Sequence, residues 1–395
     1  MKNKLIPDIR FKGFTNAWEL KRLGEITLIK TGAKDANHMI ENGKYNFFTS
    51  GINVFKCNTW SFSGKSIIIA GNGANMGYLH KTDGYFEAYQ RTYVLKTHNN
   101  VWNFIYYALA STFQKFINQK IKNGGIPFLV YNDISDFKIK ITNNSEIKVI
   151  EKIFLTLETS LSLLQRKLKM LENIKNTLLE KMFASSKSLY PSIRFKGFTN
   201  AWELINISNV VEYGLTGGTP YIQNPEYYNG NIPFLNISDI TENDGKYLTK
   251  IKKTISLKAV KNTSAKLIEQ QHLIVGMYAS IGKIAINKHN LAISQAVIAL
   301  KFKKTYDLDF YYFLFYKKYI NNEWNKESLN GVQSNLTKKT ILDLPHKTTN
   351  IKEQNKISTL LNYFYKIVSL LQRKLIFLKN NWNDSFHMKE RIKKL

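Results

Sequence analysis

The sequence contains a single cysteine, Cys57, among 395 residues. One cysteine forms neither an intrachain disulfide nor a multi-cysteine zinc site, which excludes disulfide-stapled folds and structural zinc domains. The expected state of Cys57 is a buried or unreactive thiol in a reducing cytoplasm. No metal-ligand spacing is found among the seven histidines, which are His38, His80, His98, His272, His289, His346 and His387.

Long hydrophobic runs are also missing. The N-terminal lysines Lys2 and Lys4 are not followed by the apolar stretch of a signal peptide. No segment approaches the roughly 18 apolar residues that a membrane span needs. The aromatic segment 306–320 includes two aspartates and two lysines, so we expect an amphipathic helix there. The sequence therefore predicts a cytoplasmic protein without a membrane segment.

Acidic residues are scarce, since 29 Asp and Glu stand against 57 Lys and Arg, a formal net charge of +28. The segments 1–145, 146–190, 191–350 and 351–395 are each net positive, so the excess is not confined to a basic tail. A genome rich in A·T pairs would raise the number of Lys, Asn and Ile residues, but it does not explain the shortage of acids. Such an excess favours a polyanionic partner.

Catalytic motifs fail on inspection. Residues 64–66 (Gly-Lys-Ser) resemble the end of a phosphate-binding loop, but Thr59 stands where the first glycine is required. Residues 71–73 (Gly-Asn-Gly) have the wrong spacing for a dinucleotide loop, and a tight turn is expected. Residues 224–227 lack the second proline of an Asn-Pro-Pro-Tyr methyltransferase box. Residues 146–148 (Glu-Ile-Lys) imitate a nuclease triplet, but we expect them to open a helix. No catalytic residue is predicted.

The chain contains a copy of itself. The eleven residues 10–20 recur unchanged at 194–204. Weaker matches follow, with the second copy longer by an insertion that lies mostly before Gly276. They pair Gly71, Gly77 and Gln90 with Gly276, Gly282 and Gln295, and residues 163–168 with 370–375. The sequence therefore predicts two copies of one unit, each a globular region followed by a helix.

Two heptad seams accompany the repeat. Apolar residues at alternating spacings of three and four follow residue 154 and again residue 361, without Pro or Gly, so both segments are predicted to be continuous helices. The duplication favours an antiparallel pair within the chain. A parallel self-dimer, and packing of each helix on its own domain alone, are the alternatives. The residues predicted to pack the helix pair are Phe154, Leu157, Leu161, Leu164, Leu168, Leu171, Leu361, Phe364, Val368, Leu371, Leu375 and Leu378.

Both globular halves are expected to mix helices with strands. Short β-branched runs predict strands near 67–70, 93–95, 273–275 and 296–300, and helical patterns cover 102–121 and 309–323. The fold class is therefore α+β. The predicted organisation is a globular domain over 1–145, a central helix over 146–188, a second globular domain over 189–350 and a C-terminal helix over 351–395.

The repeated Arg-Phe-x-Gly-Phe-Thr-x-x-Trp-Glu segments, the Gly-Gly-x-Pro turn at 217–220 and the paired Leu-Gln-Arg-Lys-Leu helices are similar to one known family. The chain resembles the specificity (S) subunit of type I restriction-modification systems over essentially its whole length. It departs at residues 30–34, which lack the second Gly and the Pro of the turn. The resemblance implies two mixed α/β target recognition domains separated by two long antiparallel coiled-coil helices, an internal tandem duplication with pseudo-two-fold symmetry.

The resemblance also implies a function without catalysis. In that family each recognition domain reads one half of a bipartite, asymmetric double-stranded DNA site, and the helix pair sets the gap between the halves. Two modification (methyltransferase) subunits methylate adenine with S-adenosylmethionine, and restriction (endonuclease/translocase) subunits add ATP-driven translocation and cleavage with Mg²⁺. No cofactor is expected in this chain itself.

Polar loop residues are the candidates for DNA contact, because Asn, Gln, Lys, Arg and Tyr side chains pair with base edges or phosphates. The predicted DNA-binding residues are Lys34, Asn72, Asn75, Tyr85, Gln90 and Arg91 in the first copy, and Thr219, Tyr221, Lys283, Ser294, Gln295, Gln333 and Ser334 in the second. Three other hypotheses remain: an enzyme that cuts or methylates DNA itself, a free-standing DNA-binding protein that dimerises through its helices, and a coiled-coil adaptor that binds no nucleic acid. The adaptor hypothesis leaves the charge of +28 unexplained.

Overall fold

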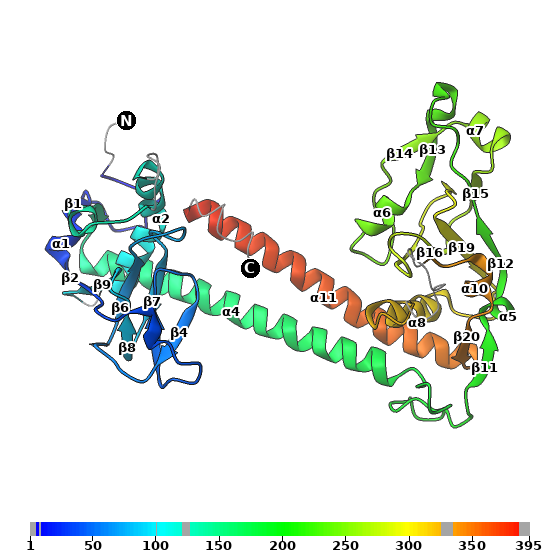
Figure 1. Ribbon diagram of the computed structural model, residues 1–395, viewed down its shortest axis with the longest axis horizontal. Helices are drawn as coiled ribbons and strands as arrows, with labels where there is room; N and C mark the ends of the chain where they lie inside the picture. The colour runs from blue at the N-terminus through cyan, green and yellow to red at the C-terminus, as the bar shows by residue number, and fades with distance from the viewer. Residues whose placement is uncertain (1–4, 8, 100, 121–126, 325–334, 387–395) are drawn as a thin grey trace. The chain divides into compact units, whose positions relative to one another are not determined.

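The structure is a computed structural model that describes residues 5–7, 9–99, 101–120, 127–324 and 335–386 (Figure 1). The chain divides into two compact units, Met1–Gln165 with Arg373–Leu395, and Arg166–Gln372. Each unit contains one globular domain together with parts of two long helices, α4 (Asn144–Lys181) and α11 (Ile351–Phe386). The predicted α+β class is confirmed. The central helix, expected over 146–188, ends at Lys181 and is followed by turns.

The described part of the first domain contains three small sheets. The strand pair joins β1 (Glu19–Arg22) to β10 (Lys138–Ile141). One four-stranded sheet has the order β2-β9-β6-β7, with bounds Thr27–Thr31, Thr92–Thr97, Ser66–Ala70 and Leu79–Thr82. The other has the order β4-β3-β8-β5, with bounds Val54–Cys57, Tyr45–Phe48, Tyr85–Ala88 and Phe62–Ser63, and its β3 and β8 run parallel. The helices are α1 (Leu23–Ile26), η1 (Ala36–His38), α2 (Trp102–Lys120) and α3 (Tyr131–Ser135).

The core of this domain forms where α2 covers the sheet that contains β6. Every residue of β6 is buried, as expected for a β-branched run that is covered on both faces. Ile67 and Ile69 share one cluster with Phe104 and Phe113 of α2. The strands and the helix predicted here are confirmed. Cys57 at the end of β4 is buried, as expected.

The second domain repeats this topology strand for strand. The pair is β11 (Glu203–Asn206) with β20 (Pro345–Thr348). The sheets have the orders β12-β19-β16-β17 (Val211–Thr216, Val297–Phe302, Leu273–Gly276, Ile284–Ile286) and β14-β13-β18-β15 (Lys253–Ile255, Tyr228–Leu235, Leu291–Ile293, Lys266–Ile268). Again the two central strands of the second sheet, β13 and β18, run parallel. The equivalence of strand orders confirms the internal duplication.

The insertion in the second copy forms helices. α6 (Ile237–Thr241) lies between β13 and β14, and α7 (Leu257–Asn262) lies between β14 and β15, where the first domain has only short loops. The remaining elements are α5 (Ile207–Val210), η2 (Pro225–Tyr227), α8 (Leu308–Ile320) and α10 (Lys338–Leu342). The added residues therefore form helices between the strands of one sheet and leave the shared strand order intact.

The aromatic helix α8 differs from the expectation. Phe310, Tyr311, Tyr312, Phe313 and Phe315 are all buried. Four consecutive helical positions point in directions about 100° apart, so their joint burial means that the helix is covered on most sides. The amphipathic prediction is therefore wrong. The aromatic side chains belong to a core cluster that also contains the end of α4 and the start of α11.

Within the second unit, α4 and α11 run antiparallel. Leu179 near the end of α4 and Leu361 near the start of α11 belong to one core cluster. Farther along, the side-chain amide of Gln372 donates to the Glu172 carboxylate at 2.8 Å. The antiparallel orientation predicted for the two long helices is thus observed in this unit.

The predicted seam residues differ in burial. Leu361 and Val368 are buried and Leu157 is exposed, while half-buried positions are taken by Phe154, Leu161, Leu164, Leu168, Leu171, Phe364, Leu371, Leu375 and Leu378. The ring of Phe154 packs on Tyr107 of its own domain, with ring centroids 4.7 Å apart. Part of each seam is therefore used by the neighbouring globular domain.

Candidate nucleic-acid interface

In the first domain, the loop after β2 meets the loop after β8. The amide of Gln90 donates to the carbonyl of Lys34 at 3.0 Å, and Arg91 follows as an exposed residue. Gly32 permits this close approach, because a Cβ atom there would lie 2.0 Å from the carbonyl oxygen of Ala88. The structure therefore brings three of the predicted residues, Lys34, Gln90 and Arg91, to one end of the domain.

The second domain builds the same junction with different side chains. The hydroxyl of Thr219 donates to the side-chain oxygen of Gln295 at 2.7 Å, and both residues are exposed. Gly217 takes the place of Gly32, since a Cβ atom there would lie 1.8 Å from the carbonyl oxygen of Ile293. One scaffold thus presents a lysine beside a glutamine in one copy and a threonine beside a glutamine in the other.

The turn between β6 and β7 carries two further predicted residues of the first domain. Asn72 is half-buried, and its side-chain oxygen has no hydrogen-bond partner among the residues that the structure describes. Asn75 is half-buried, and its carbonyl accepts from the amide of Tyr78 at 3.0 Å. The tight turn expected at residues 71–73 lies slightly later in the chain, because Asn72 forms a β-bridge with Phe128 and the Gly73 carbonyl accepts from the amide of Met76.

Other predicted residues of the second domain have partners within the protein. The ammonium group of Lys283 donates to the carbonyl of Thr241. Ser294 is 2% exposed, and its hydroxyl accepts from the amide of Ala296 at 3.4 Å, which fits a structural role in the turn. Tyr221 is exposed, and its hydroxyl donates to the side chain of Gln223. Gln333 and Ser334 lie outside the described residues.

Tyr85 lies apart from the junction of Lys34 and Gln90, because it begins strand β8 and Gln90 follows the strand's end. Its ring packs on exposed Trp60 at 4.6 Å and on Tyr45 at 6.3 Å, with the Lys44 ammonium 5.3 Å from the Tyr45 ring. Trp60 is not among the DNA-binding residues predicted from the sequence. A lone tryptophan between polar neighbours was the available signal, because exposed aromatic side chains often contact ligands or partners.

The long helices carry exposed apolar side chains at intervals of seven residues. These are Tyr363, Leu370 and Phe377 on α11, and Leu163 and Met170 on α4. Seven residues are about two turns, so each set follows one face of its helix. Leu163 and Met170 are the repeat equivalents of Leu370 and Phe377. The pattern is typical of a surface that contacts another protein.

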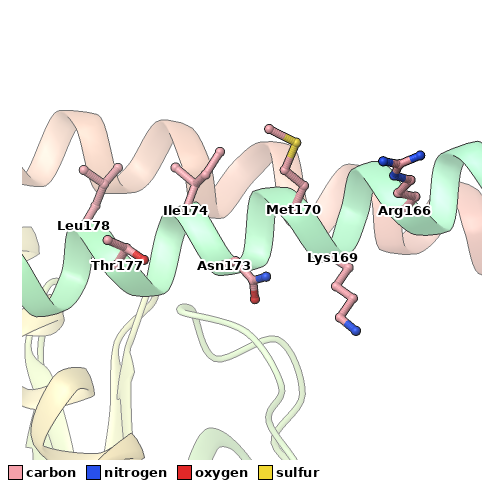
Figure 2. Close-up of a pocket in the computed structure, with 7 residues that line it drawn as sticks. All are labelled: Arg166, Lys169, Met170, Asn173, Ile174, Thr177 and Leu178. Carbon is pink, nitrogen blue, oxygen red and sulfur yellow. The ribbon is translucent and has the colours of Figure 1, made fainter.

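Met170 also lines an open groove of about 440 Å³ on α4. Figure 2 shows Met170, Ile174 and Leu178 along one edge of the helix, and Lys169, Asn173 and Thr177 along the other. A groove lined by one helix has no convergent catalytic groups and fits contact with a second protein surface better than a small molecule.

Among the described residues, no group of three His, Cys, Asp or Glu side chains is arranged to hold a metal ion. Glu146, from the triplet that imitates a nuclease, is 1% exposed and paired with Arg10, and it lies in the first turn of α4 as predicted. In the described part of the chain, no helix is long and apolar enough to cross a membrane.

Two specificity subunits share parts of the sequence. The chain is 34% identical over 133 residues to the type I restriction enzyme EcoDI specificity subunit of Escherichia coli, covering 34% of this chain and 29% of that protein. It is 25% identical over 192 residues to the MjaIX specificity subunit of Methanocaldococcus jannaschii, covering 47% and 44%. The matches thus span less than half the length of these curated relatives.

Solved structures share the fold over nearly the whole chain. The S subunit of a type I restriction-modification system from M. genitalium gives a TM-score of 0.65 at 16% identity, with 96% of this chain and 97% of that chain covered. A chain from a structure that describes complex assembly and conformational transition of the type I system gives 0.54 at 15% identity, with 96% and 98% covered.

The family profile agrees with the duplicated fold. The type I restriction modification DNA specificity domain matches residues 16–173 and again residues 200–380. Each match contains one globular domain and most of the long helix that follows it. With two copies of this domain over most of its length, the chain belongs to the family of type I restriction-modification DNA specificity subunits.

Proposed function

We propose that this chain binds a bipartite, asymmetric double-stranded DNA site, with one half read by each domain, and directs methyltransferase and restriction subunits to that site. The observation that carries the proposal is the duplicated loop junction. Equivalent positions bear Lys34 with Gln90 in one domain and Thr219 with Gln295 in the other. Both junctions contain a glutamine, but the first adds a lysine, which pairs with guanine, and the second a threonine, which pairs with several base edges. Two such domains would therefore read two different half-sites.

Charge supports DNA as the partner. The chain carries +28 at neutral pH, with the excess spread over both halves. Phosphate contacts supply most of the affinity of such proteins and make it fall with salt, whereas base contacts supply the sequence preference.

The apolar stripes on the two helices support protein partners. Leu163 and Met170 on α4 are repeated as Leu370 and Phe377 on α11, so the chain offers the same kind of contact twice. We assign these faces to two modification subunits. Catalysis then belongs to the partners: S-adenosylmethionine would be used by the modification subunits, and ATP and Mg²⁺ by the restriction subunits, with no catalytic residue in this chain.

Selection from a random duplex DNA library, with the full-length chain as bait, tests the proposed DNA binding directly. We expect enrichment of two different short motifs at one fixed separation. The variant Lys34→Ala/Gln90→Ala should relax one motif only, and Thr219→Ala/Gln295→Ala the other only. Lys65→Ala, an exposed lysine elsewhere on the first domain, serves as the control.

Two outcomes would overturn the proposal. A single palindromic motif would favour the free-standing protein that dimerises through its helices. Changes in both motifs from one double variant would contradict the assignment of one half-site to each domain.

A further inference from the structure

The eleven-residue repeat connects each domain to the long helix that follows it. The side chain of Arg10 donates two hydrogen bonds, both of 2.7 Å, to the carboxylate of Glu146 in the first turn of α4. Arg194 does the same to Glu353 in the first turn of α11, at 2.7 and 2.8 Å. These bidentate pairs have the fork geometry that fixes direction as well as distance.

Both pairs are nearly closed to solvent. The arginine side chains are 10% and 13% exposed, and the glutamates 1% and 0%. A threonine hydroxyl also donates to each carboxylate, from Thr142 to Glu146 at 2.6 Å and from Thr349 to Glu353 at 2.5 Å. The hydrogen bonds from the Arg10 guanidinium lower the pKa of Glu146 below its ordinary value, which favours the charged carboxylate.

The other end of the repeat is anchored in the domain. After Gly13 and Gly197, which turn the chain with φ of 98° and 96°, the segments reach Trp18 and Trp202. Trp18 packs on Phe104 of α2, with ring centroids 5.8 Å apart. In the second copy, Trp202 packs on Phe310 of α8 at 5.7 Å. We call residues 10–18 and 194–202 the braces, because each joins a globular domain to the first turn of its long helix.

We propose that Arg10 and Arg194 are positioning residues that set how strictly the protein selects the gap between its half-sites. The inference rests on the proposed function. One added base pair moves a half-site by about 3.4 Å and turns it by about 34° around the DNA axis. A domain held rigidly on its helix reaches only one such position, whereas a domain with a loosened brace reaches its neighbours.

The test uses the full chain in complex with its modification subunits. Plasmids carry the two half-sites at the native gap and at gaps one base pair shorter and longer, and N6-methyladenine is measured at each. For Arg10→Met/Glu146→Met, which removes both buried charges together, the ratio of methylation at the native gap to methylation at the altered gaps should fall by about tenfold. Arg194→Met/Glu353→Met should act likewise.

Controls separate this role from general stabilisation. Arg22→Met removes an arginine whose ion pair with Asp136 is exposed, and it should leave the gap ratio unchanged. Arg10→Lys retains the charge but loses the fork, so an intermediate ratio is expected, and it replaces the double variant if that one fails to fold. A uniform loss of methylation at every gap, with the ratio unchanged, would overturn the inference. Absence of methylation with the unaltered chain would instead contradict the proposed function.

Discussion

At the scale of single residues, His346 couples the stability of the second domain to pH. It lies in β20, 4% exposed, with its Nε2 atom 3.1 Å from the hydroxyl of Tyr311. Burial lowers the pKa of His346 to about 4. An unfolded histidine binds its proton near pH 6.5, so between about pH 6.5 and 4 the unfolded state holds more protons than the native state. Stability is therefore complete above this window and decreases as the pH falls through it.

We expect His346 to account for about 3 kcal/mol of stability lost between pH 6.5 and pH 4. Urea unfolding across this range measures the loss. His346→Gln should reduce the pH dependence, although buried His272, whose pKa is also lowered by burial, leaves a remainder of the same sign. His289→Gln, at an exposed site, should retain the full dependence. An unchanged pH profile in His346→Gln would show that another group controls acid unfolding.

Glycines explain why sequence identity survives where the domains otherwise diverge. Gly77 and Gly282 are equivalent, have φ of 79° and 72°, and leave room for Ile117 in one domain and Trp324 in the other. A Cβ atom would lie 2.5 Å from Ile117 or 2.1 Å from the Trp324 ring. The repeat could be found from the sequence, but its cause could not, because a close approach between distant segments leaves no local pattern.

At the scale of elements, α11 uses two faces for different purposes. Leu361 is 1% exposed in the core that α11 shares with α8 and the end of α4. Leu370 lies on the exposed stripe of the same helix. The heptad spacing predicted both long helices, and the helical pattern over 309–323 predicted α8 but not its burial. Consecutive aromatic residues beside charged ones gave an amphipathic pattern, and only the tertiary core showed that the helix is covered on most sides.

Substitution at these two leucines should separate folding from assembly. Leu361→Ala should lower the free energy of unfolding by about 2–4 kcal/mol, because it leaves a cavity. Leu370→Ala should change it by less than about 0.5 kcal/mol and instead weaken co-purification with the modification subunit. Denaturant unfolding and pull-down of the complex measure the two effects. If Leu370→Ala assembles as well as the unaltered chain, the stripe is not the partner surface.

At the scale of the whole molecule, the chain is two specificity domains in tandem, matched at residues 16–173 and 200–380. The duplication and the family could be predicted from the sequence, because identical segments and family motifs are visible in the order of the residues. The sequence did not show which of the predicted loop residues contact one another, because contacts such as that of Thr219 with Gln295 join positions far apart in the chain. Polar character alone selected Ser294, which the structure buries, together with Gln90, which it exposes.

Modularity predicts the outcome of a domain exchange. Replacing residues 205–340 with the corresponding segment of another family member should change one half-site and leave the other half-site and the gap as they were. The substituted segment contains the loops of the second domain but neither brace nor long helix. Methylation mapping of the exchanged chain provides the readout. A simultaneous change of both half-sites would contradict the modular account.

We propose that this chain binds one bipartite DNA site and directs a methyltransferase to it. The most direct measurement is a genome-wide map of N6-methyladenine in a host without adenine methylation, with the chain co-expressed with its neighbouring modification subunit. We expect a single asymmetric motif in two parts with a fixed gap, methylated once in each part. A soluble complex that leaves the genome unmethylated, or a motif without a gap, would contradict it.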